Sequence, residues 1–444
     1  MCRNRWRLHG RWFGVLLFLF LSATVLFAEA PPSNRLTLDQ AIDLALRFHP
    51  TLRTARATTQ VQEARLGEAR SDFYPKVDLT ADYRRSTANF APSSQTGSSL
   101  NRLAGLGTSN SSFDNYSSVL SLQQRIFDFG KTGATVESAR EEVQASRWTE
   151  EATREDVVVN VKVAYFALLG TRYLVRVNEE TVQQFEQHLE QAQGFFSIGT
   201  RPKFDVTKAE VDLTNARLNL IRAKNNAEVA RVTLANAIGL PNQSIGELED
   251  ILNFKKFEVT EKEALEEAMS QRPELRSILA TKRAAEASVR ATQRAFFPVL
   301  SGTADYTYRG QDFPLIWNWD VGLNLTFPIF SGFLQKSQVA EARANLGTVF
   351  GNEELLRQNI FLEVRQTYLN LLEAEERVLT SNIVVRQAEE NLELANGRFQ
   401  AGVGTSVERT DAQVLLTNAK TTQIQSLYDY KVAVAHLEKA MGRP

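Results

Sequence analysis

Apolar residues recur at every seventh position along two long stretches of the chain. The first series lies in residues 131–196, which contain no proline, and the second follows 203 residues later. A seven-residue period is typical of helices packed as left-handed coiled coils, and 66 helical residues extend about 99 Å. An ordinary amphipathic helix is the alternative, but six consecutive heptads in each series favour the coiled coil. The two series are Val161, Leu168, Val175, Val182, Leu189 and Phe196, and Val364, Leu371, Val378, Val385, Leu392 and Phe399.

Each long stretch is followed by a turn and a return helix with small residues at one heptad position. The turns contain Gly199 in one copy, and Gly402 and Gly404 in the other. Small side chains let neighbouring helix backbones approach closely, which suits the wall of a tight bundle better than a thick hydrophobic core. The small residues are Ala209, Ala216, Ala223, Ala230 and Ala237, and Ala412, Ala419, Ser426, Ala433 and Ala440.

Four other segments alternate apolar and polar residues, which is the period of a β-strand. They lie at 77–83, 120–126, 300–308 and 319–329. Their lengths are close to the roughly ten residues of a tilted strand that crosses a bilayer. Helices predicted at 36–70 and 259–294, with Thr37 and Thr260 as N-caps, precede the two strand pairs.

The chain is internally duplicated. The tetrapeptide at 80–83 recurs at 303–306, displaced by 223 residues, whereas Gly239 and Gly442 are displaced by only 203. The Ser/Gly/Asn-rich segment 91–112 accounts for the 20 extra residues and predicts an exposed loop. We expect a signal peptide at 1–28, a first repeat at 29–241, an inter-repeat linker at 242–258 and a second repeat at 259–444. Each repeat would contain a helix, a β-hairpin and a long coiled-coil helix pair.

The N-terminus has the features of an export signal. Four arginines precede the apolar run at 12–21, and small residues follow at Ala28 and Ala30. A membrane anchor is the alternative, but the run is short for a membrane span. Cys2 is the only cysteine and lies in this segment, so an exported mature chain would lack disulfides, catalytic thiols and Cys-ligated metals. No other run of 18 apolar residues occurs, so no transmembrane helix is expected.

Composition excludes several further classes. The 444 residues are 43% hydrophobic and 23% charged, with 51 Lys and Arg against 52 Asp and Glu. This mixture is too apolar for a disordered chain, and it lacks the basic excess of a nucleic-acid-binding protein. The histidines and methionines show no metal-ligand spacing, and no phosphate-binding glycine motif is present. We therefore expect no enzymatic activity, no cofactor, no metal and no nucleic acid.

Four strands with one apolar face leave two open sheet edges, and lipid tolerates such edges only when they close into a barrel. Two chains would give eight strands and a filled interior, whereas three would give twelve and a lumen. Aromatic residues at the strand ends fit the girdles of a membrane barrel, although packing around a soluble sheet is the alternative. These residues are Tyr74, Phe127, Phe129, Tyr306, Tyr308, Trp317, Phe330 and Phe333.

Several sequence motifs occur once in each repeat and in the same order, and together they resemble those of the TolC-type outer membrane efflux and secretion channels. They are the FYP and FFP helix-to-strand junctions, the strand exits RIFDFG and PIFSGF, and the tips FSIGTRPKFDVTKAE and FQAGVGTSVERTDAQ. The resemblance implies a mainly α fold with a transmembrane β-barrel portion: a homotrimer with 12 strands in the outer membrane lipid and an α-helical barrel in the periplasm. It also implies a periplasmic adaptor (membrane fusion) protein and an inner-membrane transporter as partners of this exit duct.

The second helical tip is the candidate gate. Glu408 and Asp411 are three residues apart at the start of the last helix and therefore share a face. The helix dipole alone would favour acids there, but a threefold axis would gather six carboxylates into a cation-selective ring. The resemblance places the two acids at the constriction of the periplasmic entrance.

The resemblance also implies a latch that holds the entrance shut. It matches Asp205 and Phe399 to one polar pair, although a phenylalanine cannot donate a hydrogen bond. Gly404 stands at a basic family position, for which Arg201 or Arg409 would compensate. Opening would be an iris-like movement of residues 190–215 and 393–418.

A pore-free periplasmic coiled-coil adaptor or scaffold is the alternative function. It would explain the export signal and the heptads but not four strands of membrane length. The sequence does not indicate whether drugs, solvents, metals or proteins would be exported.

Overall fold

The computed structural model describes residues 35–87, 112–242 and 245–443, and the expected signal peptide, most of segment 91–112 and Pro444 lie outside them. Two runs of helix, helix, strand, strand, long helix and return helix follow one another. In chain order the elements are α1 (Leu38–Phe48), α2 (Pro50–Ser71), β1 (Lys76–Thr87), β2 (Ser112–Phe127), α3 (Lys131–Ser197), α4 (Lys203–Ile238), α5 (Glu261–Gln271), α6 (Pro273–Arg294), β3 (Val299–Gly310), β4 (Ile316–Thr326), α7 (Leu334–Gln400) and α8 (Ser406–Met441).

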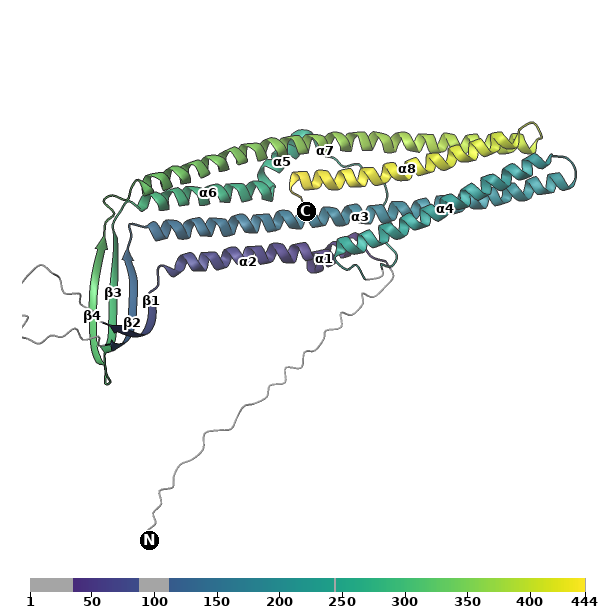
Figure 1. Cartoon of the computed structure of the whole chain (residues 1–444). Helices are drawn as coiled ribbons and strands as arrows, with labels where there is room; N and C mark the ends of the chain where they lie inside the picture. Colours follow the sequence, from purple (N-terminus) through teal and green to yellow (C-terminus); the bar gives the residue numbers. More distant parts are fainter. Residues whose placement is uncertain (1–34, 88–111, 243–244, 444) are drawn as a thin grey trace, which may run out of the picture.

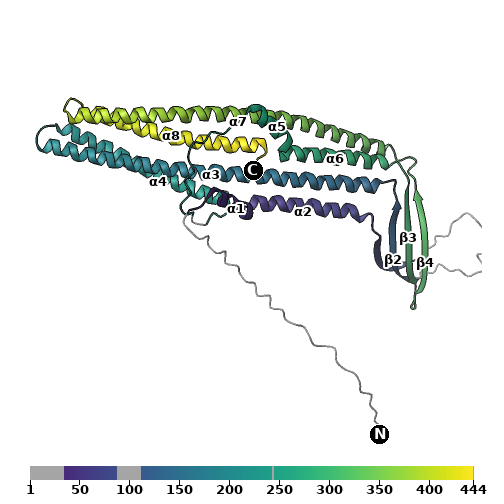
Figure 2. The ribbon, with the colours of Figure 1, turned by 180° about the vertical axis from the view of Figure 1, so that it is seen from behind.

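The described chain forms a long rod with the sheet at one end and two helical hairpins at the other (Figure 1). Next to the sheet, α2, α3, α6 and α7 run side by side, and beyond mid-length α4 and α8 return along α3 and α7. The short helices α1 and α5 lie near mid-length, as the reverse view also shows (Figure 2). This arrangement separates the sheet from the hairpin turns by the full length of the helices.

Each of the two helices expected before a hairpin is in fact two helices. Thr37 and Thr260 form capping boxes with Gln40 and Glu263, which confirms the predicted starts. The single spans expected at 36–70 and 259–294 were wrong, because Pro50 and Pro273 each begin a new helix. A proline disfavours helical geometry in the residue before it, so the preceding residue is extended and the axis changes direction.

The helix breaks are packed against the ends of the return helices. Gly239, after α4, has a φ of +83°, and a methyl group there would lie 2.8 Å from the Cα atom of His49 at the first break. Gly442, after α8, has a φ of +77°, and a methyl group there would lie 3.0 Å from the amide nitrogen of Arg272 at the second. Only glycine provides both the left-handed backbone and the space.

The long helices confirm the heptad prediction, and α3 lies at the centre of the bundle. It packs on α1, α2, α4, α6 and α8, and it is long and apolar enough by length and composition to cross a membrane. Because 56% of its apolar window is buried, it resembles a core helix. The heptad residues are buried or half-buried except Phe196, which is 46% exposed close to the hairpin turn.

Two related hydrophobic cores lie at mid-length. In one, Ala41 and Ala45 of α1 pack on α3, and in the other Ala264 and Ala268 of α5 pack with α7 and α8. All four alanines have 0% exposure, so the short helices contact the long ones closely. Toward the hairpin turns the buried apolar clusters are much smaller.

Segment 245–260 contains no helix or strand and is fixed to the bundle by two tyrosines. The Tyr165 hydroxyl lies 3.1 Å from the Glu249 carbonyl oxygen and 2.9 Å from that of Leu36, which forms a parallel bridge with Leu248. The Tyr430 hydroxyl donates to the Lys255 carbonyl at 2.7 Å and accepts from the Phe257 amide at 2.9 Å. These bonds satisfy backbone groups that regular structure would otherwise pair.

The sheet confirms the four predicted strands, in the antiparallel order β1-β2-β3-β4, although β4 ends at Thr326 rather than Ile329. Within the described residues β1 and β4 each pair on one side only. The register places apolar rows and polar rows on opposite faces. Two apolar rows are Leu79, Leu120, Tyr306 and Trp319, and Val77, Leu122, Ala304 and Val321, and the polar row between them is Asp78, Ser121, Asp305 and Asp320.

Aromatic side chains gather at both ends of the strands. At the helical end, Phe129 stacks on Phe297 with centroids 5.2 Å apart, and the tilted ring of Phe127 lies 4.8 Å from that of Phe129. At the far end, Tyr306 stacks on Trp317 at 6.2 Å. An apolar sheet face bounded by two aromatic groups is typical of a barrel that spans a membrane.

Candidate functional site at the helical tips

The far ends of the two helical hairpins are shaped by three glycines. Gly199 and Gly402 have φ angles of +72° and +76° and close the two turns. A methyl group at Gly404 would lie 2.9 Å from the Phe399 amide nitrogen. A basic side chain at Gly404 would therefore displace the turn, which explains why this position lacks one.

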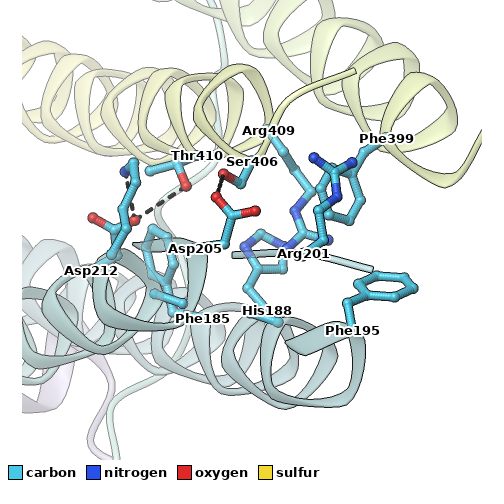
Figure 3. A pocket seen from close by; sticks show the side chains of 13 residues that line it. Phe185, His188, Phe195, Arg201, Asp205, Asp212, Phe399, Ser406, Arg409 and Thr410 are labelled. Atoms are coloured by element: carbon cyan, nitrogen blue, oxygen red, sulfur yellow. Dashed lines mark hydrogen bonds and ion pairs between the residues drawn. The ribbon is translucent and has the colours of Figure 1, made fainter. Parts of the chain in front are cut away.

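A small cavity lies between the hairpins, and side chains from α3, α4, α7 and α8 line it (Figure 3). Its volume is about 20 Å³, which is enough for one water molecule. The site residues Arg201, Asp205, Phe399 and Arg409 all contribute to its lining. The structure thus brings together four positions that are far apart in the sequence.

Hydrogen bonds join α8 to the other hairpin around this cavity. The Ser406 hydroxyl donates to Asp205 at 2.9 Å, and the Thr410 hydroxyl donates to Asp212 at 3.2 Å. Arg409 donates through Nη1 to the Gln191 side chain at 2.6 Å. Three separate bonds therefore hold the start of α8 against α3 and α4.

Two arginines contact the ring of Phe399. The Arg409 guanidinium carbon lies 4.2 Å from the Phe399 ring centroid, and that of Arg201 lies 5.2 Å from it. The Arg201 side chain also donates to the Gly404 carbonyl at 3.4 Å. Cations over an aromatic face attract it, so Phe399 contributes to the contact without a hydroxyl group.

Burial lowers the pKa of two basic groups in the cavity. His188 is 7% exposed and Arg409 is 6% exposed. Burial lowers the pKa of Arg409 to about 10. Burial, and secondly the charge of Arg409, lower the pKa of His188 to about 4, although Asp212 opposes the shift. Among the described residues no ion pair joins Arg409 to an acid.

Glu408 and Asp411 lie on the exposed face of α8, away from the cavity. Glu408 is 3.5 Å from Arg398 of α7, and its amide donates to the Thr405 hydroxyl at 3.1 Å, which caps the helix. Arg409, Ala412 and Gln413 occupy the buried face. Both acids are thus exposed on the side of α8 that another chain or an open space would meet.

Sequence reasoning did not identify Ser406, Thr410, Asp212 and Gln191 as contact residues. Polar residues of this kind occur on every solvated helix, and their partners lie 198 to 218 residues away in the chain. The resemblance indicated Asp205, Phe399, Arg201 and Arg409 as latch residues, and all four lie in this contact. His188 of α3 is also buried in this contact.

The sequence profile of the family described as "Outer membrane efflux protein" matches residues 41–240 and again 264–443. The chain belongs to this family. Its function is therefore that of an outer membrane efflux channel rather than that of a pore-free adaptor or scaffold. The family and the structural neighbours are channels rather than enzymes.

Outer membrane protein TolC of Escherichia coli K12 is 24% identical to this efflux protein over 426 residues, with 91% of this chain and 82% of TolC covered. The crystal structure of the Campylobacter jejuni CmeC outer membrane channel matches with a TM-score of 0.77 at 22% identity, covering 91% of this chain and 85% of CmeC. The open state of the Neisseria gonorrhoeae MtrE outer membrane channel matches with a TM-score of 0.76 at 21% identity, covering 91% and 89%.

Proposed function

We propose that three copies of this efflux protein form one passive channel, with a 12-stranded barrel in the outer membrane and a helical tunnel in the periplasm. The observation that carries the proposal is the sheet, which has one apolar face and two unpaired edges. In lipid, unpaired backbone groups cost several kcal/mol each, and only closure with further copies removes them.

The polar face of the sheet supports three copies rather than two. Eight strands leave an interior that side chains fill, whereas twelve leave an open lumen. Asp78, Asp305 and Asp320 share one row of the polar face, so closure would turn them inward. Carboxylates need water, so their presence favours the wider barrel.

The energy for transport would come from an inner-membrane transporter, connected to the channel by a periplasmic adaptor. The sequence contains no phosphate-binding glycine motif that would indicate a nucleotide site. The substrates would be set by those partners, because a wide tunnel selects little by itself.

The contacts around the cavity would hold the periplasmic entrance shut, and residues 190–215 and 393–418 would move apart when the adaptor binds. Support comes from the bonds of Ser406, Arg409 and Thr410 across the two hairpins. The MtrE channel, which has the same fold, has been crystallised in an open state. The joined hairpins described above would correspond to the closed form.

The exposed pair Glu408 and Asp411 would form an acidic ring of six carboxylates in the trimer. Fields from carboxylates in a narrow opening attract cations and retain multivalent ones. We expect Asp411→Asn with Glu408→Gln to lower the cation-to-anion permeability ratio by about threefold or more and to relieve block by divalent cations. Reversal potentials of single channels in a salt gradient across planar bilayers measure the permeability ratio, and single-channel conductance at increasing divalent-cation concentration measures the block.

Glu266→Gln is the matched control, because it removes one exposed carboxylate from α5 near mid-length. Its selectivity should equal that of the unmodified channel. Unchanged selectivity in the double variant would contradict the proposed acidic ring but not the proposed channel. The assembly is tested separately: a folded protein that remains monomeric and soluble without detergent would overturn the whole proposal.

A further inference from the structure

His188 is a buried base of α3 at the contact between the two hairpins. Its ring lies edge-on to Phe185, with centroids 5.7 Å apart, and it lines the cavity from α3 (Figure 3). Within the described chain its Nδ1 atom is buried and has no hydrogen-bond partner, and the Nε atom of Arg409 is in the same condition. Both atoms belong to side chains that are more than nine-tenths buried.

The surroundings of His188 already contain more basic than acidic groups. Asp205 accepts a hydrogen bond from Ser406, while Asp212 accepts from both Lys208 and Thr410. The acids are therefore engaged in the closed tip. Phe399 of α7 adds no charge. The charged groups that line this cavity with His188 are Asp205, Lys208 and Asp212 of α4, Arg409 of α8 and Arg201 of the turn.

We propose that His188 makes the closed entrance sensitive to acid: a proton on its imidazole places a second cation beside Arg409, and α8 then separates from α3. The proposal rests on the proposed gate, to which it adds a regulatory signal. Opening would admit water to the cavity, which would solvate both cations. The uncharged imidazole is thus part of the closed state.

The direction of the effect follows from the lowered pKa of His188. The closed tip favours the neutral imidazole, so its stability is complete above the ordinary histidine pKa of about 6.5. That stability is lost as the pH falls toward the closed-state value of about 4. If opening restores the ordinary pKa, the open-to-closed ratio of one protomer rises about 30-fold between pH 7.5 and pH 5.

The test is single-channel recording of purified trimers in planar bilayers at about pH 7.5 and about pH 5, a range in which ordinary carboxyl groups stay ionised. We expect the unmodified channel to conduct more at the lower pH. His188→Gln and His188→Asn, which cannot titrate, should give flat pH profiles. His436→Gln is the matched control, because burial also lowers the pKa of His436, which lies near the other end of α8, and this variant should keep the acid response.

A second measurement leaves His188 unchanged. Asp205 and Ser406 are in side-chain contact across the hairpins, and an exported chain without Cys2 has no other cysteine. A disulfide in Asp205→Cys with Ser406→Cys should abolish the acid response, and reduction should restore it. An acid response that persists in a His188 variant, or in the oxidised double cysteine, would overturn the proposal. Absence of channels at every pH would instead contradict the proposed function.

Discussion

Gly239→Ala should destabilise the folded protomer by about 2–5 kcal/mol, and Gly442→Ala should do the same. A left-handed backbone costs an alanine about 1–2 kcal/mol, and forcing a methyl group against packed neighbours typically costs about 1–3 kcal/mol more. At Gly239 the methyl group would meet the backbone of His49, and at Gly442 that of Arg272. Backbone cannot rotate away as a side chain can. The thermal unfolding midpoint of the detergent-solubilised protein measures the loss.

Gly199→Ala separates the two causes. Gly199 also has a positive φ, of +72°, but nothing lies within 4 Å of the added methyl group. The Gly199→Ala substitution should therefore destabilise the protomer by only about 1–2 kcal/mol, which is the cost of the left-handed backbone alone. Equal losses in all three variants would show that the contact between each return helix and its helix break contributes nothing.

Arg409→Ala should shift the tip toward the open form by about fivefold or more. The variant loses a charged hydrogen bond to Gln191 and the stacking on Phe399, worth roughly 1–3 kcal/mol together after the relief of the buried charge. Single-channel conductance at neutral pH should rise. The acid response should also weaken, because a protonated His188 would no longer meet a cation on α8.

Arg398→Ala is the control for this substitution. Arg398 lies on the same tip, but its side chain is 58% exposed and its pair with Glu408 spans 3.5 Å. Exposed ion pairs contribute about 0–1 kcal/mol, so conductance should change little. An Arg409 variant that behaves like the Arg398 variant would mean that the arginine on Phe399 does not hold the entrance.

Periodicity predicted the regular elements well, because burial of one face determines them. The heptads located both long helices, and strict alternation located all four strands. The helix breaks at Pro50 and Pro273 were missed, although the prolines were visible, because the apolar spacing continues across them. Phe196 occupies a heptad position but is exposed, because fewer apolar side chains pack together near the end of the hairpin.

The contacts at the helical tips were harder to predict than the fold. Family resemblance identified Asp205, but its hydrogen-bond donor proved to be Ser406 rather than the residue at Phe399. Phe399 instead holds two arginines through its ring face, an interaction that leaves no pattern in the sequence. Contacts between residues some 200 positions apart depend on how the two hairpins meet, which local spacing does not encode.

The uneven distribution of buried apolar side chains along the rod has a mechanical consequence. The large cores surround α1 and α5, while only small clusters support the last turns. Backbone amides at mid-length should exchange with deuterium slowly and those near the hairpin ends quickly, because local opening costs less where less apolar surface is exposed. Each protomer would thus be rigid over most of its length and deformable at the hairpin ends, so that the channel could widen at one end while the packing elsewhere is kept.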